Sequence, residues 1–510
     1  MRLFRFTIPI SRLKLNLLAN FAGTGWSTLM GLVFIPLYIQ FMGIEAYGLI
    51  GFYVALQGAL QILDFGLSPT MNREMARYSV QPERAGEARD FVRTLEIGYW
   101  AIGLFIGLVI WALAPFIATH WIKAATLPVS VMQSAVVSMG IASALQWPLS
   151  FYQGGLLGLQ RQTLLNSLLI AISTLRNGGA ALILWLISPT ITAFFAWQIV
   201  VSAVQVSLIT IGLWRSLPHA DHTPRFRLTL LKSIRRFATG MSGITLSALI
   251  LTQLDKVILS KLLSLELFGY YTLAGVVGNG LALMVGPVFN IVFPQLSALA
   301  AVSNTEVVKR FYHRSAQLMA VIVLPVAAML VFFASEILLL WTGNIETTRN
   351  VAPIASLLVF GSALNSIMVL PYCLQLAYGW TSLGVRINIF LIIFMVPTVL
   401  FLSTHYGPLG AAAVWVALNG LYILIGAPLT HRRLLKGEGW RWFVEDVSLP
   451  AIGAILAAWI GRVVMINSMP GLPTIIGLST VSLGALMAAI LAAHQIRSWA
   501  WNQFMRLSSI

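Results

Sequence analysis

The sequence predicts an all-α integral membrane protein with about fourteen transmembrane helices. Of its 510 residues, 58% are hydrophobic and only 9% are charged, whereas about 25% of the residues in a typical soluble domain are charged. Too few charges remain to cover the surface of a water-soluble fold. A membrane-spanning helix needs about 20 apolar residues, so the chain can supply that many spans with short connections between them.

The apolar runs that are long enough to span a bilayer are bounded by charged residues or by Gly and Pro. We predict spans at 16–41, 46–68, 94–121, 129–157, 163–187, 190–214, 237–262, 268–298, 315–341, 351–378, 384–403, 408–430, 447–467 and 473–496. No run alternates as a membrane β-barrel requires. The first run is too long for the apolar region of a signal peptide, so we expect it to remain as a helix.

The basic residues are distributed unevenly along these spans. With the N-terminus inside, all but six of the 32 Lys and Arg residues fall on the cytoplasmic side. The others are Lys123, Arg176, Lys256, Lys261, Arg349 and Arg462. This asymmetry predicts that both termini are cytoplasmic. It also explains most of the formal charge of +16 without nucleic acid as a partner.

The two halves of the chain resemble each other at an offset of 221 residues. At this offset, Glu45-Ala46-Tyr47-Gly48 matches Glu266-Leu267-Phe268-Gly269, and Phe91-Val92-Arg93-Thr94 matches Tyr312-His313-Arg314-Ser315. Because each half contains an even number of spans, we expect a pseudo-two-fold axis along the membrane normal. The predicted division is a six-helix bundle with its linker at 1–236, a second six-helix bundle at 237–446 and two additional helices at 447–510.

Little in the chain points to chemistry on covalent bonds. The longest polar stretches, 69–93 and 215–236, are shorter than the roughly 50 residues that a folded domain needs. Cys373 is the single cysteine, and the seven histidines form no metal-binding pair of the HExxH kind. No Walker or GxGxxG loop is present. We therefore expect no enzymatic activity and no metal or other cofactor.

Arg176 is the first candidate for a substrate-binding cavity. Counted from Thr163, it lies roughly 20 Å into the fifth span, where a charge costs about 2.5 to 3.5 kcal/mol. Asn166 and Ser173 share its face of the helix, and Asn20 lies on a polar face of the first span. Such an arginine lines a wet cavity, neutralises an acid on a neighbouring helix or extends towards the interface, and these alternatives stay open.

The eighth span carries a second polar stripe, which includes Asn279 and Asn290. Pro287 and Pro294 predict a broken backbone near the middle of the membrane, which favours a helix that moves or lines a cavity. Small and amide side chains also mediate plain helix packing, so a polar stripe alone does not assign a cavity.

Five other charged residues are candidates for a gate or for ion coupling. Asp255 and Lys256 lie near the outer end of the seventh span, where an ion pair with another helix is the simpler interpretation. Asp64 lies near the inner end of the second span, followed by Arg73 and Arg77. These arginines would pair with Asp64 or receive phosphate at a cytoplasmic mouth, although orientation by positive charge also explains them.

Two segments carry a family resemblance, namely Leu63-Asp64-Phe65-Gly66-Leu67-Ser68-Pro69-Thr70-Met71-Asn72-Arg73-Glu74 and Gln253-Leu254-Asp255-Lys256-Val257-Ile258-Leu259-Ser260. Together with the Glu-x-Tyr-Gly hairpin, they resemble the bacterial polysaccharide biosynthesis transporters. These are the O-antigen and lipid-linked oligosaccharide flippases of the multidrug, oligosaccharidyl-lipid and polysaccharide exporter superfamily.

The resemblance implies that the protein flips an undecaprenyl-diphosphate-linked oligosaccharide from the cytoplasmic to the periplasmic leaflet of the inner membrane. It implies a water-filled, cationic cavity, which an arginine on a polar stripe would suit. It also implies membrane lipids as neighbours and a polysaccharide polymerase with its chain-length machinery as further partners.

Three other functions stay open. A drug or cation antiporter of the same superfamily would share the layout but should hold an acid deep in its N-terminal half, whereas Glu45, Asp64 and Glu96 lie near span ends. A lipid II flippase is harder to distinguish from an oligosaccharide flippase, because the sequence does not reveal which sugar the substrate carries. An integral membrane polymerase or ligase would need a large periplasmic loop, and the predicted outer loops are short.

Overall fold

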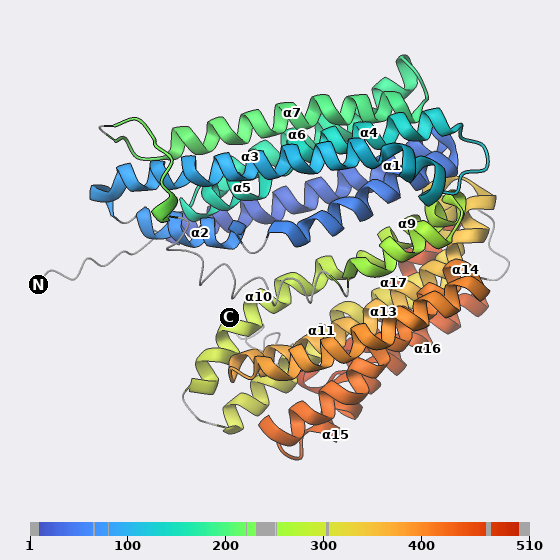
Figure 1. The fold of residues 1–510 in the computed structure, drawn as a ribbon. Helices are drawn as coiled ribbons and strands as arrows, with labels where there is room; N and C mark the ends of the chain where they lie inside the picture. Colours follow the sequence, from blue (N-terminus) through green and yellow to red (C-terminus); the bar gives the residue numbers. More distant parts are fainter. Residues whose placement is uncertain are drawn as a thin grey trace, which may run out of the picture. The chain divides into compact units, whose positions relative to one another are not determined.

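The computed structural model describes residues 10–64, 67–79, 81–220, 222–230, 250, 252–301, 305–465 and 471–498. Across these residues every regular element is a helix. The chain divides into two compact units, Met1–Glu266 and Leu267–Ile510 (Figure 1). The predicted all-α membrane fold is confirmed, and each unit is described separately below.

The first unit is a bundle of long helices joined by short turns. Its core pairs are α1 with α6, α3 with α4, and α7 with both α4 and α6, and the long helices run alongside one another in Figure 1. The helical residues 252–262 also belong to this unit. Its labelled elements are α1 Ile10–Leu60, η1 Gln61–Asp64, α2 Leu67–Tyr78, η2 Pro82–Arg84, α3 Ala85–Phe116, η3 Ile117–Trp121, α4 Val129–Gln146, α5 Leu149–Gly158, α6 Gln162–Leu186 and α7 Ile191–Ser216.

The second unit is built around two central helices, α11 and α13. The helices α10 and α14 pack against α13, and the last two helices, α16 and α17, pack against each other and against α11. The elements are α9 Leu265–Asn279, α10 Ala282–Ala301, α11 Thr305–Phe332, α12 Ala334–Thr342, α13 Ile345–Ala377, α14 Thr381–Leu434, α15 Gly439–Arg441, η4 Trp442–Ser448, α16 Leu449–Val464 and α17 Leu472–Ala492.

The predicted spans agree with the helices once two sharp bends are recognised. Within the described residues, 11 helical segments are long and apolar enough to cross a membrane. Two of them, α1 and α14, each contain two predicted spans. Gly43 (φ 83°) separates the halves of α1 and Gly407 (φ 58°) separates those of α14, since glycine adopts positive φ without a steric penalty. Most of the predicted seventh span, namely 237–249 and 251, lies outside the described residues.

The predicted second span, 46–68, is too long at its C-terminal end. The transmembrane helix ends at Leu60, a short 3-10 turn follows, and α2 then begins at Leu67. On α2 the side chains of Thr70, Met71 and Met75 are buried, whereas Arg73 and Arg77 lie on its outer face. This amphipathic helix packs against α5, so the polar stretch after the second span contains an ordered surface helix.

The eighth span is broken at a different place from the one predicted. The helix passes through both Pro287 and Pro294, which lie inside α10. The break is at Gly280 and Leu281, where the 3-10-type hydrogen bonds Gly280 N to Val277 O (3.1 Å) and Leu283 N to Gly280 O (3.3 Å) replace helical ones. Membrane helices tolerate proline where neighbouring groups satisfy the freed carbonyls.

The boundary between the two units follows the packing of the seventh span. The Leu265 N–H donates to the Lys123 carbonyl (2.7 Å), and Lys123 Nζ donates to the Leu262 carbonyl (3.1 Å). Trp121 Nε1 donates to Ser260 Oγ (3.1 Å). Residues 252–266 are therefore attached to the first unit, while the division at 236 and 446 stays a prediction.

Candidate functional site

Arg176 lies on α6 inside the first unit and is held by two glutamines of α7. Its Nη1 donates to Gln198 Oε1 and its Nη2 donates to Gln205 Oε1, each over 2.6 Å. Both glutamines are buried, with 5% and 9% of their surface exposed. The long apolar faces of α6 and α7 pack together, and this packing brings the three side chains into contact.

The two glutamines that contact Arg176 belong to a polar stripe on α7, which the positions of charged residues alone do not indicate. Gln198, Ser202 and Gln205 follow one another at positions i, i+4 and i+7 of α7, so they lie on one face of that helix. Their side chains are all buried. Polar residues at this spacing in an otherwise apolar span are the signal that could have identified them.

The polar contacts continue from Ser202 towards α1. Gln146 on α4 donates to Ser202 Oγ and to Tyr53 Oη, both over 2.9 Å. Gln57 donates to the same Tyr53 hydroxyl over 2.8 Å. Amides and hydroxyls from α1, α4 and α7 therefore form one hydrogen-bonded network beside the arginine.

The charge of Arg176 is not neutralised within the described part of the chain. No carboxylate among the described residues lies within ion-pair distance of its guanidinium, and its hydrogen bonds go to neutral amides. The alternative of an arginine paired with a neighbouring acid is thus wrong for these residues. A guanidinium carries five N–H donors, of which the two glutamines take two, so donors remain that an anion could accept from.

Asn166 and Asn20 meet each other. Asn166 Nδ2 donates to Asn20 Oδ1 (2.5 Å) and to the Gln162 carbonyl (2.8 Å), and Ser173 donates to the Ile170 carbonyl of its own helix (3.0 Å). These polar side chains of α6 therefore form hydrogen bonds with α1 and with the backbone of their own helix. Asn166 and Arg176 are ten positions apart, about 15 Å along a helix.

The other predicted cavity residues, Asn279 and Asn290, lie in the second unit. Asn279 is the last residue of α9 and Asn290 lies within α10, and both side chains are exposed. Their assignment to a substrate cavity stays a prediction.

The predicted gate residues occupy two places in the first unit. Lys256 donates to the Thr252 carbonyl (2.7 Å) and to Gln253 Oε1 (3.3 Å), and Asp255 beside it is partly buried. Asp64 accepts from the hydroxyls of Tyr99 (2.7 Å) and Ser68 (2.8 Å).

The arginines of α2 lie close to an acid on their own helix. Arg77 pairs with Glu74 (3.2 Å), and Arg73 lies 3.9 Å from the same carboxylate. The expected pairing of Asp64 with Arg77 is therefore replaced by local contacts of each residue. The gate and coupling roles stay predictions.

Two acids of the first unit that the sequence placed near span ends, Glu96 and Glu45, contact neighbouring groups. Glu96 is 6% exposed and accepts from Tyr152 Oη (2.7 Å) and Trp214 Nε1 (3.1 Å), besides its ion pair with Arg93 (2.9 Å). Glu45 accepts from the backbone N–H groups of Ala125 and Thr126. Both carboxylates are thus bound by groups of the protein, and the expectation that the N-terminal half holds no deep acid for a cationic substrate stays a prediction.

Residues 40–345 match the sequence pattern of the family described as "Polysaccharide biosynthesis protein". The chain belongs to this family. A relative named "Putative O-antigen transporter", from Shigella flexneri, is 21% identical over 400 residues, which covers 78% of this chain and 93% of the relative. The predicted family is confirmed.

Solved structures of other membrane proteins share this fold. The lipid II flippase MurJ in an inward closed conformation superposes with a TM-score of 0.65 at 13% identity, over 96% of this chain and 99% of MurJ. An inward-facing multidrug resistance MATE transporter of the MOP superfamily gives a TM-score of 0.63 at 16% identity, over 80% of this chain and 94% of that one. The family and the fold place the protein among multi-pass membrane proteins.

Proposed function

We propose that the protein flips a polyprenyl-diphosphate-linked oligosaccharide, such as an O-antigen unit or another surface polysaccharide unit, across the bacterial inner membrane by alternating access. The direction is from the cytoplasmic to the periplasmic leaflet, with both termini cytoplasmic. The family match and the O-antigen transporter relative support this substrate class.

The polar headgroup of such a substrate needs hydrogen-bonding partners while it crosses the membrane. The diphosphate and the sugars cannot cross the apolar core without hydrogen-bonding partners, because each unsatisfied polar group in the bilayer costs several kcal/mol. The polyprenyl tail can stay in the lipid. A transport protein must therefore offer a polar, cationic environment to the headgroup alone.

One observation carries the proposal, namely that Arg176 is held by two neutral amides. An arginine paired with a carboxylate would have little net attraction for phosphate, whereas this one keeps its full positive charge. Hydrogen bonds between arginine and phosphate are charge-assisted and roughly twice as strong as neutral ones. The amide and hydroxyl network beside Arg176 suits the hydroxyl-rich sugars next to a diphosphate. We assign Asn20 and Asn166 to the same polar face.

A flippase of this kind has expected partners, and two other transport functions can be compared with it. We expect membrane lipids around the helices and a polymerase with chain-length machinery on the receiving side. A drug or cation antiporter is disfavoured by a buried cation without an acid partner among the described residues. The substrate of a lipid II flippase also carries a polyprenyl diphosphate, so Arg176 does not distinguish this alternative from the proposal.

Reconstitution tests the proposal. The full-length protein in liposomes is supplied with a fluorescent undecaprenyl-diphosphate oligosaccharide, and the fraction that a membrane-impermeant quencher can reach is followed over time. We expect leaflet transfer by the native protein. Transfer of no such lipid, together with uptake of a small cationic drug, would replace the proposal by the antiporter alternative.

Variants at Arg176 test its role within that assay. Arg176→Gln removes the charge and should reduce the transfer rate at least about tenfold, because a hydrogen bond to a charged group contributes about 1.5 to 3 kcal/mol. Arg176→Lys retains the charge but not the two-pronged geometry, so an intermediate rate is expected. Equal rates in the native protein and Arg176→Gln, at equal amounts in the membrane, would exclude Arg176 from the cavity.

A further inference from the structure

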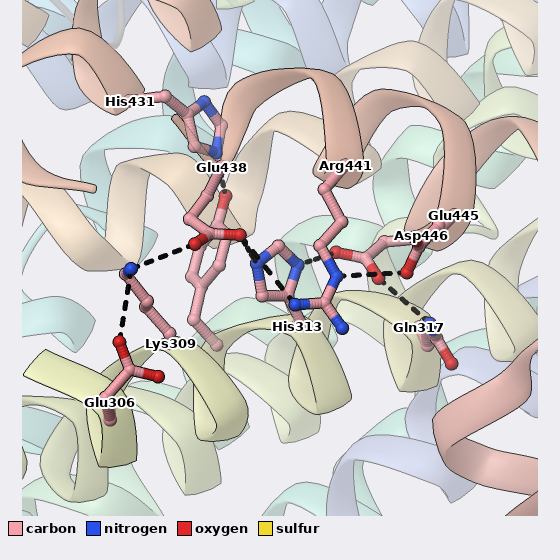
Figure 2. A network of polar contacts seen from close by, with 10 residues as sticks. Glu306, Lys309, His313, Gln317, His431, Glu438, Arg441, Glu445 and Asp446 are labelled. Carbon is pink, nitrogen blue, oxygen red and sulfur yellow. Dashed lines mark hydrogen bonds and ion pairs between the residues drawn. The ribbon is translucent and has the colours of Figure 1, made fainter. Parts of the chain in front are cut away.

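A histidine is enclosed by two carboxylates inside the second unit (Figure 2). His313 on α11 has a side chain that is 1% exposed. Its Nδ1 contacts Asp446 Oδ2 of η4, and its Nε2 lies 3.2 Å from Glu438 Oε2, which precedes α15. The ring therefore bridges two segments that are more than 120 residues away in the sequence.

The two contacts constrain the protonation of the ring. A neutral imidazole has one N–H donor and one acceptor nitrogen. Here both nitrogens face carboxylate oxygens, so a neutral ring would oppose a lone pair to an ionised carboxylate. The arrangement is satisfied only when the three groups together hold one more proton than neutral His313 and two carboxylates do.

The environment of Glu438 excludes this carboxylate as the group that holds the additional proton. Lys309 pairs with Glu438 Oε1 (3.0 Å), and Arg441 lies 3.9 Å from Oε2. Burial alone would raise the pKa of Glu438, but the hydrogen bond from Lys309 and the adjacent charges of His313 and Lys309 outweigh it, so its pKa is lowered. Glu438 is therefore ionised at neutral pH.

The carboxylate of Asp446 has fewer cationic neighbours than that of Glu438 and relies on His313 for its counter-charge. Its side chain is fully buried, and within the described residues His313 is the one cationic group within ion-pair distance of it. Its second oxygen accepts from Gln317 Nε2 (2.9 Å), which is neutral. A buried carboxylate that loses its counter-charge is strongly destabilised.

We propose that His313, Asp446 and Glu438 form a proton-binding site that attaches the last two transmembrane helices to α11. The bound proton makes the ring an imidazolium, which donates to both acids. Asp446 lies on η4, a π-helical segment that continues directly into α16. π-helical turns often mark functional sites.

Gln317 links the same cluster to the end of α17. Gln317 donates to Asp446 and its Oε1 accepts from the backbone N–H of Gln495, just beyond the end of α17 (2.8 Å). Release of the proton would leave Asp446 buried without a counter-charge and would weaken the contact of η4 with α11. The proton site would thus control how firmly α16 and α17 are held.

Other titratable groups surround the cluster, and one of them is a matched control. His431 accepts from Tyr312 Oη at Nε2 (3.0 Å) and donates from Nδ1 to the Ala427 carbonyl (2.7 Å), so its neutral form is fully satisfied. Beyond α17, Arg497 donates to the Leu491 carbonyl. The remaining groups are Glu306, Lys309 and Tyr312 on α11, Cys373 on α13, Arg441 on α15 and Glu445 on η4.

Nitrogen-15 NMR of histidine-labelled, full-length protein in nanodiscs tests the proposal at neutral pH. We expect one ring with both nitrogens protonated, whose signal disappears in His313→Gln and persists in His431→Gln. In Asp446→Asn the ring should be mostly neutral. A neutral His313 in the native protein, or a doubly protonated ring that survives in Asp446→Asn, would overturn the proposal.

Hydrogen exchange supplies the second readout. At one fixed pH, amides of 442–464 should exchange several-fold faster in His313→Gln and Asp446→Asn than in the native protein, and at the native rate in His431→Gln. Unchanged exchange in both cluster variants would refute the attachment role. If His313→Gln does not fold, Glu438→Gln and Asp446→Asn still report on the ring, because both keep all seven histidines. None of these measurements depends on the transported substrate.

Discussion

The Nη1 of Arg176 and the Oε1 of Gln198 lie 2.6 Å apart, and Gln205 makes an equal contact with Nη2. Neutral side chains thus position the guanidinium inside a helical bundle without neutralising its positive charge. A carboxylate at either position would hold the guanidinium as well or better, but it would cancel the charge.

Gln198→Glu tests whether this neutrality matters. The new carboxylate would form an ion pair with Arg176 at a contact of the same length, so we expect normal folding and a loss of diphosphate-lipid transfer of about tenfold or more. The liposome assay measures it. Gln198→Met is the control, because it removes one hydrogen bond and retains the charge, and should reduce transfer less. Equal effects of the two substitutions would show that geometry and not charge governs the site.

Gly158→Ala should loosen the surface helix α2. A Cβ at Gly158 would lie 2.4 Å from the Asn72 carbonyl oxygen and 2.7 Å from Met75 Cβ, so α2 must move away from α5. Overpacking of this kind costs about 1 to 3 kcal/mol, seen as a lower midpoint of thermal unfolding in detergent. Gly98→Ala on α3 meets nothing within 4 Å and should leave the midpoint unchanged or slightly higher. A similar drop in both variants would contradict the close contact.

Asp90 should hold the segment that follows α7. This fully buried carboxylate accepts from the Arg225 backbone N–H (2.7 Å) and pairs with Arg227 Nε (2.7 Å). Asp90→Ala removes both contacts, and since a charged hydrogen bond contributes about 1.5 to 3 kcal/mol, trypsin should cut after these arginines about tenfold faster. Glu83→Ala, at an exposed position of η2, should leave the cleavage rate unchanged. Identical rates in all three proteins would show that Asp90 does not secure the segment.

The lowered pKa of Glu438 predicts a dependence of stability on acid. A carboxyl whose pKa is lower in the folded state stabilises the fold above its ordinary value of 4.5, and this contribution is lost as the pH falls below that value towards the folded-state pKa. The thermal midpoint of the native protein should therefore decrease on acidification through this range more steeply than that of Glu438→Gln. Parallel curves for the two proteins would show that Glu438 gains no such stabilisation.

Much of the fold could be predicted because insertion of a helix depends on its own residues. Apolar length and flanking charges identify each span locally, and even the bends at Gly43 and Gly407 fall between predicted spans. The error at 46–68 arose because apolar residues, interrupted by Asp64, continue from Ile62 to Leu67, past the end of the transmembrane helix at Leu60.

The sequence by itself determined the membrane fold, the family and the single arginine deep in the fifth span. Only the tertiary structure decided what that arginine contacts, because the rotation of α7 about its axis selects Gln198 and Gln205 from all its polar residues. The same holds for His313 and Asp446, which are 133 residues apart and meet only through packing of η4 on α11. The hydropathy of a span is a property of one helix, whereas a polar contact depends on how two helices are placed relative to each other.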